Sequence, residues 1–373
     1  MRSRSRRASF RLALKLGLVA AAALAAVLPL PSAVTDRFYA NRAYPLLQGG
    51  LTSISNLIPF SIGDLLLLVL ALGLPIWWIL RINRSPGRRI RTTGLLAFNS
   101  LVLAAGIYLS FLALWGLNYQ RAPLMVRLDY DESRLTDQAM GEFFRSTIQR
   151  LNSDSVRVHA EARQTDEELR HQLFASFTAC VTELGNSGKM TAAVPKVSLS
   201  DPWLGATGVA GFTNPFGLEV ILNSDLLPIE RPFTLAHEWA HLAGFADESE
   251  ANFIALLTCA RSELPAIRYS GWLAIYPYLQ PAKADRDRLA QGVKWNEILP
   301  ALAEEVTDDL HSIVERSARR MSPTISRMQS QVYDGFLKAN RVEAGIMSYG
   351  LFVRLVLGTR FESEWSPARQ TQQ

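Results

Sequence analysis

The sequence predicts an α+β protein that is mostly helical, with three N-terminal transmembrane helices followed by one large domain. Three observations predict this class. Three long, nearly uncharged apolar runs lie within the first 117 of the 373 residues, and each is close to the roughly 20 residues that cross a bilayer. Apolar residues at helical spacing dominate the rest of the chain. Only two segments, 194–200 and 207–223, have the Val-rich pattern, interrupted by Gly, Pro and Asn, that is typical of strands.

The apolar runs cover about residues 12–30, 57–80 and 94–116, and residues 1–117 are expected to form the membrane anchor. The first run is expected to remain in the mature protein, because Pro29 and Pro31 fit poorly around a small-residue cleavage site. Residues 31–56 are expected to form a short loop. Asp64 is expected at the end of the second run, as a helix cap or interfacial group.

The positions of the basic residues predict the orientation of the chain in the membrane. Six lie within residues 1–15 and five lie between residues 81 and 92. If all three runs span, both groups lie on one side, which is cytoplasmic by the positive-inside rule. The N-terminus is therefore expected in the cytoplasm and the large domain outside it, with the lipid bilayer as a partner.

The charge of the large domain excludes one class of partner. The first 117 residues hold 13 Lys/Arg and 2 Asp/Glu, whereas the remainder holds 26 and 32. The high pI therefore comes from the anchor, and the domain itself is acidic. Since nucleic-acid binding needs a basic face on the folded part, we expect no nucleic-acid partner.

The large domain is expected to span residues 118–361, followed by a flexible polar tail over 362–373. Residues 133–152 have the spacing of an amphipathic helix. Thr165 and Glu168 form a capping-box pattern that opens a second helix running to Gly185. Everything after Arg231 reads as helical as far as the tail. The only cysteines, Cys180 and Cys259, are expected to be buried free thiols, with a disulfide as the alternative.

The most informative stretch is PFTLAHEWAHLAGFADESEANFIA, which covers residues 232–255 and contains His-Glu-x-x-His. On a helix, His237 and His241 lie on one face and can hold one ion. Glu238 lies about 100° round the axis, within reach of a water on that ion. We expect the helix to begin near Arg231 and to end at Gly244, a residue that adopts the left-handed conformation readily. The cofactor that this pattern predicts is Zn²⁺.

The third ligand is a choice among three carboxylates. Glu248 shares a helical face with Ala251 and Asn252, so Asn252 could orient Glu248 or a histidine. Glu250 lies about 200° from Glu248, and together with Asp247 it suits a capping box at the start of the next helix. A rival reading, His-Glu-x-x-His-x-x-Gly-x-x-Asp, has the spacing of metzincin-type enzymes and ends at Asp247. We predict Glu248, with Glu250 and Asp247 as alternatives.

Two resemblances follow from these residues. Glu248-x-x-Ala251-Asn252 resembles the Glu-x-x-Ala-Asp/Asn signature of gluzincin peptidases, in which the first Glu ligates zinc. More closely, the chain resembles a family of bacterial membrane proteins that is catalogued as a domain of unknown function. The matching stretches are 59–64 (PFSIGD), 115–121 (WGLNYQR), 211–215 (GFTNP), the His237 stretch, 337–340 (LKAN) and 348–350 (SYG). The resemblance implies a zincin-like domain on a multi-pass anchor in the bacterial inner membrane, with that domain in the periplasm.

These patterns together predict a membrane-anchored zinc metallopeptidase acting on a peptide or protein at the membrane surface. Glu238 would be the general base towards a zinc-bound water. Tyr349 and His311 are the candidate donors to the oxyanion. Residues 217–223 are a candidate edge strand for an extended peptide. The alternatives are a zinc amidase acting on cell-envelope material and a non-catalytic, metal-stabilised scaffold or regulator.

Overall fold

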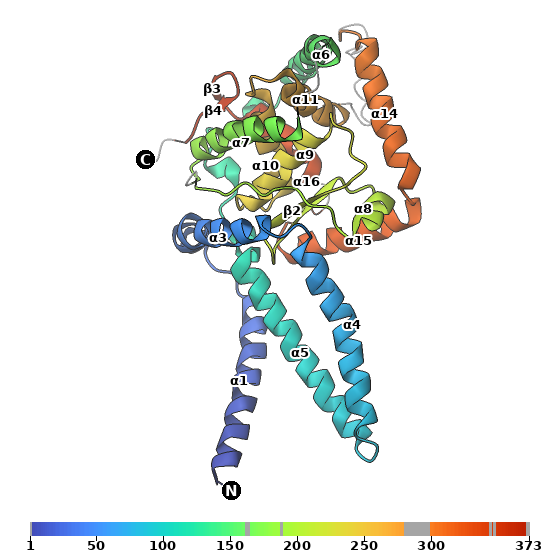
Figure 1. Cartoon of the computed structure of the whole chain (residues 1–373). Coiled ribbons are helices and arrows are strands. Elements are labelled where there is room, and N and C mark those ends of the chain that lie inside the picture. The colour runs from blue at the N-terminus through green and yellow to red at the C-terminus, as the bar shows by residue number, and fades with distance from the viewer. Residues whose placement is uncertain are drawn as a thin grey trace.

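The computed structural model describes residues 2–160, 165–186, 189–279, 299–342, 345 and 348–370. Three helices extend from one side of the globular part, as Figure 1 shows: α1 (Arg2–Val27), α4 (Ile62–Asn83) and α5 (Arg89–Leu114). Within them, residues 9–27, 62–83 and 89–114 are long and apolar enough to cross a membrane. The expectation of three apolar N-terminal helices is confirmed, with the third beginning earlier than residue 94.

Residues 31–56 are not the loop that the sequence predicts. They form α2 (Ser32–Val34), a π-helical segment η1 (Thr35–Ala43) and α3 (Tyr44–Asn56). Polar contacts across the fold hold this segment in place, because Gln48 bonds both backbone groups of Thr191 and Thr52 Oγ1 donates to Leu218 O. Long-range hydrogen bonds of this kind produce no apolar periodicity that could be recognised in the sequence. The prediction of a loop over residues 31–56 was wrong for this reason.

The globular part is built mainly from helices. They are η2 (Gly116–Gln120), η3 (Leu124–Val126), η4 (Glu132–Arg134), α6 (Asp137–Ala160), α7 (Asp166–Glu183), α8 (Asp201–Thr207), α9 (Arg231–Leu242), α10 (Glu248–Ala260), α11 (Pro265–Leu279), α14 (Glu304–Arg320), α15 (Pro323–Ala339) and α16 (Ser348–Gly358). The capping box of Thr165 and Glu168 at the start of α7 is present as predicted.

Helix α10 lies at the centre of the globular part (Figure 1). All its residues except Glu250 are buried, and α7, α9, α11 and α16 pack around it. Its sequence is apolar on nearly every side, which is typical of a helix enclosed by others. This placement sets Glu248, the first residue of α10, against the neighbouring α9.

The strands within segments 194–200 and 207–223 are shorter than expected. Strands β1 (Gly211–Asn214) and β2 (Glu219–Leu222) pair antiparallel, with Gly211 opposite Leu222. Segment 194–200 contributes a single parallel bridge, in which Lys196 pairs with Ile221. Residues 201–207 are helical instead of leading into a strand. The coarse expectation of a mostly helical chain with a small β component is confirmed.

The C-terminal segment packs against the globular part, whereas the sequence predicts a flexible polar tail from residue 362. Strands β3 (Phe361–Ser363) and β4 (Ser366–Pro367) form a second small sheet. Trp365 packs on Trp272 of α11, with ring centroids 5.1 Å apart, and Ala368 is buried. The tail predicted from residue 362 therefore packs against the domain as far as residue 370, because Trp365 and Ala368 supply apolar area that burial stabilises.

The buried carboxylate of Glu219 joins α4 to the first sheet and also forms an ion pair. Lys196 Nζ lies 2.8 Å from Glu219 Oε2, and both side chains are almost fully buried. The same carboxylate accepts hydrogen bonds from Ser61 Oγ and from the amides of Ile62 and Gly63 in the first turn of α4. An anionic side chain at a helix N-terminus is favourable because of the exposed amides and the helix dipole there.

Asp64 also ties α4 to the globular part. Its carboxylate accepts hydrogen bonds from Ser198 Oγ and Leu199 N, both at 2.7 Å, while Ser61 is the N-cap of α4. Asp64 thus lies at the start of the helix, as predicted. Its carboxylate bonds the globular part instead of capping the helix. Cys180 and Cys259 are both buried free thiols, so the disulfide alternative is wrong.

Candidate metal centre

Helix α9 carries the His-Glu-x-x-His motif and has the predicted ends. Pro232 lies in its first turn, where the missing N–H costs no hydrogen bond. At the other end, Gly244 has φ +87°, and Phe245 N donates to Ala240 O at 3.0 Å. This left-handed termination turns the chain sharply back towards α10.

The C-terminal carbonyls of α9 are held by residues from the segments that follow the apolar helices. Trp115 Nε1 donates to His241 O, and Tyr44 Oη donates to Leu242 O, each at 2.9 Å. The buried guanidinium of Arg121 donates to Gly244 O at 2.8 Å, and a cation is favourable at this end of a helix. The segments that follow the apolar helices therefore position the motif directly.

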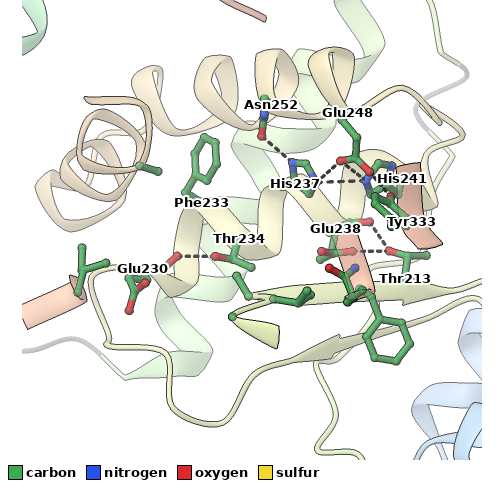
Figure 2. Close-up of a pocket in the computed structure, with 18 of the residues that line it drawn as sticks. Thr213, Glu230, Phe233, Thr234, His237, Glu238, His241, Glu248, Asn252 and Tyr333 are labelled. Carbon is green, nitrogen blue, oxygen red and sulfur yellow. Dashed lines mark hydrogen bonds and ion pairs between the residues drawn. The ribbon is translucent and has the colours of Figure 1, made fainter. Parts of the chain in front are cut away.

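Three ligand atoms converge where α9 meets α10 (Figure 2). The Nε2 atoms of His237 and His241 are 3.1 Å apart, and Glu248 Oε2 lies 3.2 Å from the first and 3.4 Å from the second. Ligand atoms about 2.0–2.1 Å from a tetrahedral zinc are about 3.3 Å from one another. All three groups are buried, and together they form a set that could hold a metal ion.

Both imidazoles are oriented by hydrogen bonds at the other ring nitrogen. His237 Nδ1 lies 2.9 Å from Asn252 Oδ1, and His241 Nδ1 lies 2.8 Å from Phe245 O. Because a backbone carbonyl only accepts, His241 Nδ1 carries a proton, and in the neutral imidazole Nε2 presents its lone pair. Such partners fix the tautomer and raise the basicity of a ligating histidine.

One carboxylate oxygen of the cluster is placed to bind a cation together with the two imidazoles. Glu248 Oε2 is fully buried, and the groups that face it are the Nε2 atoms of His237 and His241, which carry no proton in the neutral form that binds a metal, whereas Oε1 accepts a hydrogen bond from Tyr333 Oη. A buried carboxylate oxygen is costly unless it is paired. The residues present therefore fit a zinc ion, with two nitrogens and one oxygen as ligands.

The other two candidate carboxylates lie in different places. Asp247 is the N-cap of α10 and accepts from Ser249 N and Glu250 N, as the sequence predicts. Glu250 accepts from Leu124 N instead of completing the capping box. Glu250 points towards residues 124–126 because that segment, far away in sequence, offers an unpaired amide. Of the three carboxylates, the structure places Glu248 beside the histidines.

Glu238 lies next to the cluster on α9, with Thr213 of β1 against it (Figure 2). Thr213 Oγ1 lies 2.9 Å from Glu238 Oε2 and 3.0 Å from Glu238 O. Burial raises the pKa of Glu238 above its ordinary value, although the nearby imidazoles of His237 and His241 act in the opposite direction. A raised pKa suits a carboxylate that accepts a proton and later returns it.

The electrostatics of the cluster favour positive charge. Burial alone would lower the pKa of His241, but the Glu248 carboxylate outweighs burial and raises it to about 9. Burial alone would raise the pKa of Glu248, but His241 and His237 outweigh burial and lower it. The field that draws protons to the imidazoles also attracts a cation placed among the three ligand atoms.

The two predicted oxyanion donors have different outcomes. Tyr349 is in the first turn of α16, and its side chain lies outside the described residues. His311 is exposed on α14, while Leu310, Ile313 and Val314 of that helix face the cavity beside the cluster. The structure therefore does not bring His311 to the cluster, because its side chain is exposed and is not among those that line the cavity.

A cavity of about 1210 Å³ lies in front of the cluster. It is lined mostly by apolar groups, and His237, Glu238 and His241 are at its wall. Strand β1 borders the cavity through Gly211, Phe212 and Thr213. Strand β2 lies behind β1, bonded on its far side to segment 194–200.

The strand that faces the cavity is β1, not residues 217–223 as the sequence predicts. Asn223 N donates to Ala210 O, and hydrogen-bonded pairs alternate along an antiparallel ladder. The backbone N–H and C=O of Gly211 and Thr213 therefore point away from β2, at the edge of the sheet. That edge can accept an extended chain.

The comparisons place the chain in a family without a known function. Residues 39–357 match the sequence profile of the family described as Protein of unknown function (DUF3810). The chain belongs to this family. No curated protein and no solved structure matches the chain. The DUF3810 region includes α4, α5, β1, α9 and α10, and so it contains the whole candidate metal centre and the helices that support it.

Sequence reasoning missed Thr213 and Tyr333. Thr213 lies in the GFTNP stretch, which resembles the family but to which the sequence analysis assigns no role. Tyr333 lies on α15, far from the motif in sequence, and only packing brings it to Glu248. Neither residue follows a spacing rule, since each comes from a separate element.

Proposed function

We propose that this DUF3810 protein is a membrane-anchored zinc metallopeptidase with a gluzincin-like, zincin-type domain. The observation that carries the proposal is the convergence of His237, His241 and Glu248 beside a buried Glu238 at the wall of a large cavity. Two histidines and a glutamate are the ligand set of several zinc peptidases, and they leave one coordination position open.

The chain's own residues supply the remaining parts of hydrolysis. A bound zinc ion would supply a Lewis acid that activates water and polarises a carbonyl. Glu238, oriented by Thr213, accepts the proton of the attacking water and delivers it to the leaving amine. The free edge of β1 aligns an extended peptide through the backbone groups of Gly211 and Thr213. Tyr333 positions Glu248 through its hydrogen bond.

We propose that the site lies at the membrane surface. The three apolar helices anchor the chain in the bacterial inner membrane, with the N-terminus in the cytoplasm and the globular domain in the periplasm. The arginines at both cytoplasmic ends support this orientation. A periplasm-active reporter fused after residue 130 should be active, and a silent reporter would contradict the topology.

The decisive experiment compares zinc content and hydrolysis in the purified full-length chain. Wild type should hold about one zinc, and His237→Ala should lose most of it, because two of the three ligands do not form a stable site. Glu238→Gln should keep the zinc but lower cleavage of a mixed peptide library at least ~100-fold, the usual effect of a general base. Glu263→Gln, on the exposed turn before α11, is the matched control and should behave as wild type.

Each alternative has its own result in this experiment. A zinc-loaded wild type that cleaves cell-wall amides and leaves peptides intact would establish the amidase. A zinc-loaded wild type that cleaves neither, with Glu238→Gln indistinguishable from it, would establish the scaffold. Zinc retained in full by His237→Ala would overturn the ligand assignment.

A further inference from the structure

The cavity at the metal cluster extends to the apolar helices. Besides the cluster, its wall includes Leu67, in the second turn of α4, and Phe111, in the last turn of α5. Both residues lie within segments that are long and apolar enough to cross a membrane. One end of the cavity is therefore bounded by side chains that face lipid if these helices span.

Helices α4 and α5 diverge towards this end of the cavity (Figure 1). They meet near their short connection, where Trp78 Nε1 donates to Ser100 Oγ at 3.1 Å, and they separate towards the globular part. Helix α5 packs on α1, but none of the residues of α4, all of them described, is buried. Leu67 is thus 61% exposed, and among the described residues α5 contacts this side of α4 near the short connection, at Trp78.

An aromatic wall connects this region to the metal ligands. Phe111 contacts Trp115, with ring centroids 6.2 Å apart, and Trp115 contacts His241 at 6.3 Å. Tyr119 and Phe336 extend the wall, each ring lying within about 6 Å of a neighbour in it. A chain segment leaving the space between α4 and α5 would meet aromatic surface until it reached the cluster.

Helix α15 lies across the globular end of α4 and α5 (Figure 1). Its inner side carries Tyr333 and Phe336 at the cavity. Ile325, Met328 and Val332 are exposed at helical spacing on the same helix. An amphipathic helix with an exposed apolar stripe beside membrane helices is suited to the bilayer surface, which places this wall of the cavity at the lipid boundary.

We propose that the substrate is a membrane-anchored polypeptide whose apolar anchor lies between α4 and α5. The adjoining extended segment then follows the aromatic wall to β1 and the metal cluster. The inference rests on the proposed peptidase function and specifies its substrate class. A polypeptide fits better than a lipid because the backbone edge of β1 at Gly211 and Thr213, to which no other described strand pairs, can bond an extended chain. Anchoring confines the cleavable segment near the site, which raises its effective concentration.

The binding test uses the full-length chain in vesicles of phosphatidylethanolamine and phosphatidylglycerol. The probe is a synthetic peptide with a 20-residue Leu/Ala helix and a mixed-sequence tail on the domain side, at about the length that spans a bilayer. A photo-crosslinking amino acid replaces Leu67 in the Glu238→Gln background. The control replaces Leu65, which is also exposed and lies about 160° away round the helix.

The anchored probe should crosslink from position 67 at least about ten times more than from position 65, and unlabelled probe should compete. Equal crosslinking from both positions would overturn the proposal, because it would show only random contact in the bilayer. Crosslinking of a photoactivatable phospholipid at position 67 that the anchored probe does not displace would also overturn it, and would assign the space to lipid.

A cleavage test separates this inference from the peptidase function. Wild type should cleave the anchored probe at least ~100-fold faster than the free tail, as effective concentration predicts. Leu67→Trp should slow cleavage of the anchored probe by about tenfold or more, whereas Leu65→Trp should not. Similar rates for anchored probe and free tail would refute the anchor site and leave the peptidase intact. Selective crosslinking with no cleavage of either substrate would refute the peptidase instead.

Discussion

Replacing Lys196 by Met tests how much the buried ion pair with Glu219 of β2 stabilises the fold. Methionine retains most of the side-chain volume, so the change removes mainly the positive charge beside Glu219. The two side chains are only 4% and 1% exposed and lie 2.8 Å apart. Removing one partner of such a pair leaves an uncompensated buried charge, which costs about 3–5 kcal/mol.

The pKa of Glu219 reflects the whole set of groups around its carboxylate, of which Lys196 is one. Burial alone would raise this pKa, but the hydrogen bonds from Lys196, the Gly63 amide and Asn214 outweigh burial and lower it from 4.5 to about 2. A shift of this size corresponds to about 3 kcal/mol at neutral pH. Because the folded-state pKa is depressed, the stabilisation is complete above about pH 4.5 and is lost as the pH falls towards 2.

Thermal unfolding of the full-length chain in detergent is the assay. At pH 7, Lys196→Met should lower the Tm by roughly 6–15 °C, at the few degrees per kcal/mol typical of large domains. The double variant Lys196→Met/Glu219→Gln should recover part of the loss, because no buried charge remains unpaired. Lys338→Met, which removes an exposed ion pair with Asp334, is the matched control and should shift the Tm by no more than about 2 °C.

A Tm for Lys196→Met within about 2 °C of wild type would refute this reasoning. So would a double variant that is less stable than the single one, because then the charge itself would not be the cause.

Two further predictions concern the metal helix and its neighbours. Asn252→Ala should lower the zinc affinity about 10- to 100-fold, since it removes the hydrogen bond that orients the ligand His237. Competition with a chromophoric chelator measures this affinity, and Thr258→Ala, also buried on α10, is the control. Equal zinc affinities in the two variants would contradict the prediction. Gly244→Ala should destabilise the chain by more than about 1 kcal/mol, because φ is +87° and a Cβ would lie 2.8 Å from side-chain atoms of Asn118 and Arg121. Gly335→Ala, where a Cβ meets nothing within 4 Å, should be neutral or stabilising, and unfolding curves in which both variants match wild type would dismiss the strain argument.

Local rules were sufficient for much of the metal helix. The spacing of His237 and His241 placed them on one face, Gly244 ended the helix, and Asp247 capped the next one. These features depend on residues within a few positions of one another, so they can be predicted from the sequence alone. The three apolar helices were predictable for the same reason, because length and composition alone decide whether a helix can cross a bilayer.

Contacts between distant segments were beyond such rules. The helices over residues 31–56 form where Gln48 and Thr52 bond the globular part, and β1 rather than β2 faces the cavity because segment 194–200 pairs with β2. Thr213 and Tyr333 reach the cluster from separate elements. Each outcome depends on which buried polar group finds a partner, and that depends on the packed fold.

The His-Glu-x-x-His stretch shows this division within one site. By itself the sequence determined two imidazoles on one helical face, because the helix period is a local property of the backbone. It left three carboxylates as candidates for the third position. Only the tertiary structure decided that Glu248 meets the histidines, because the packing of α10 against α9 brings its carboxylate to their Nε2 atoms while Glu250 is drawn to the amide of Leu124.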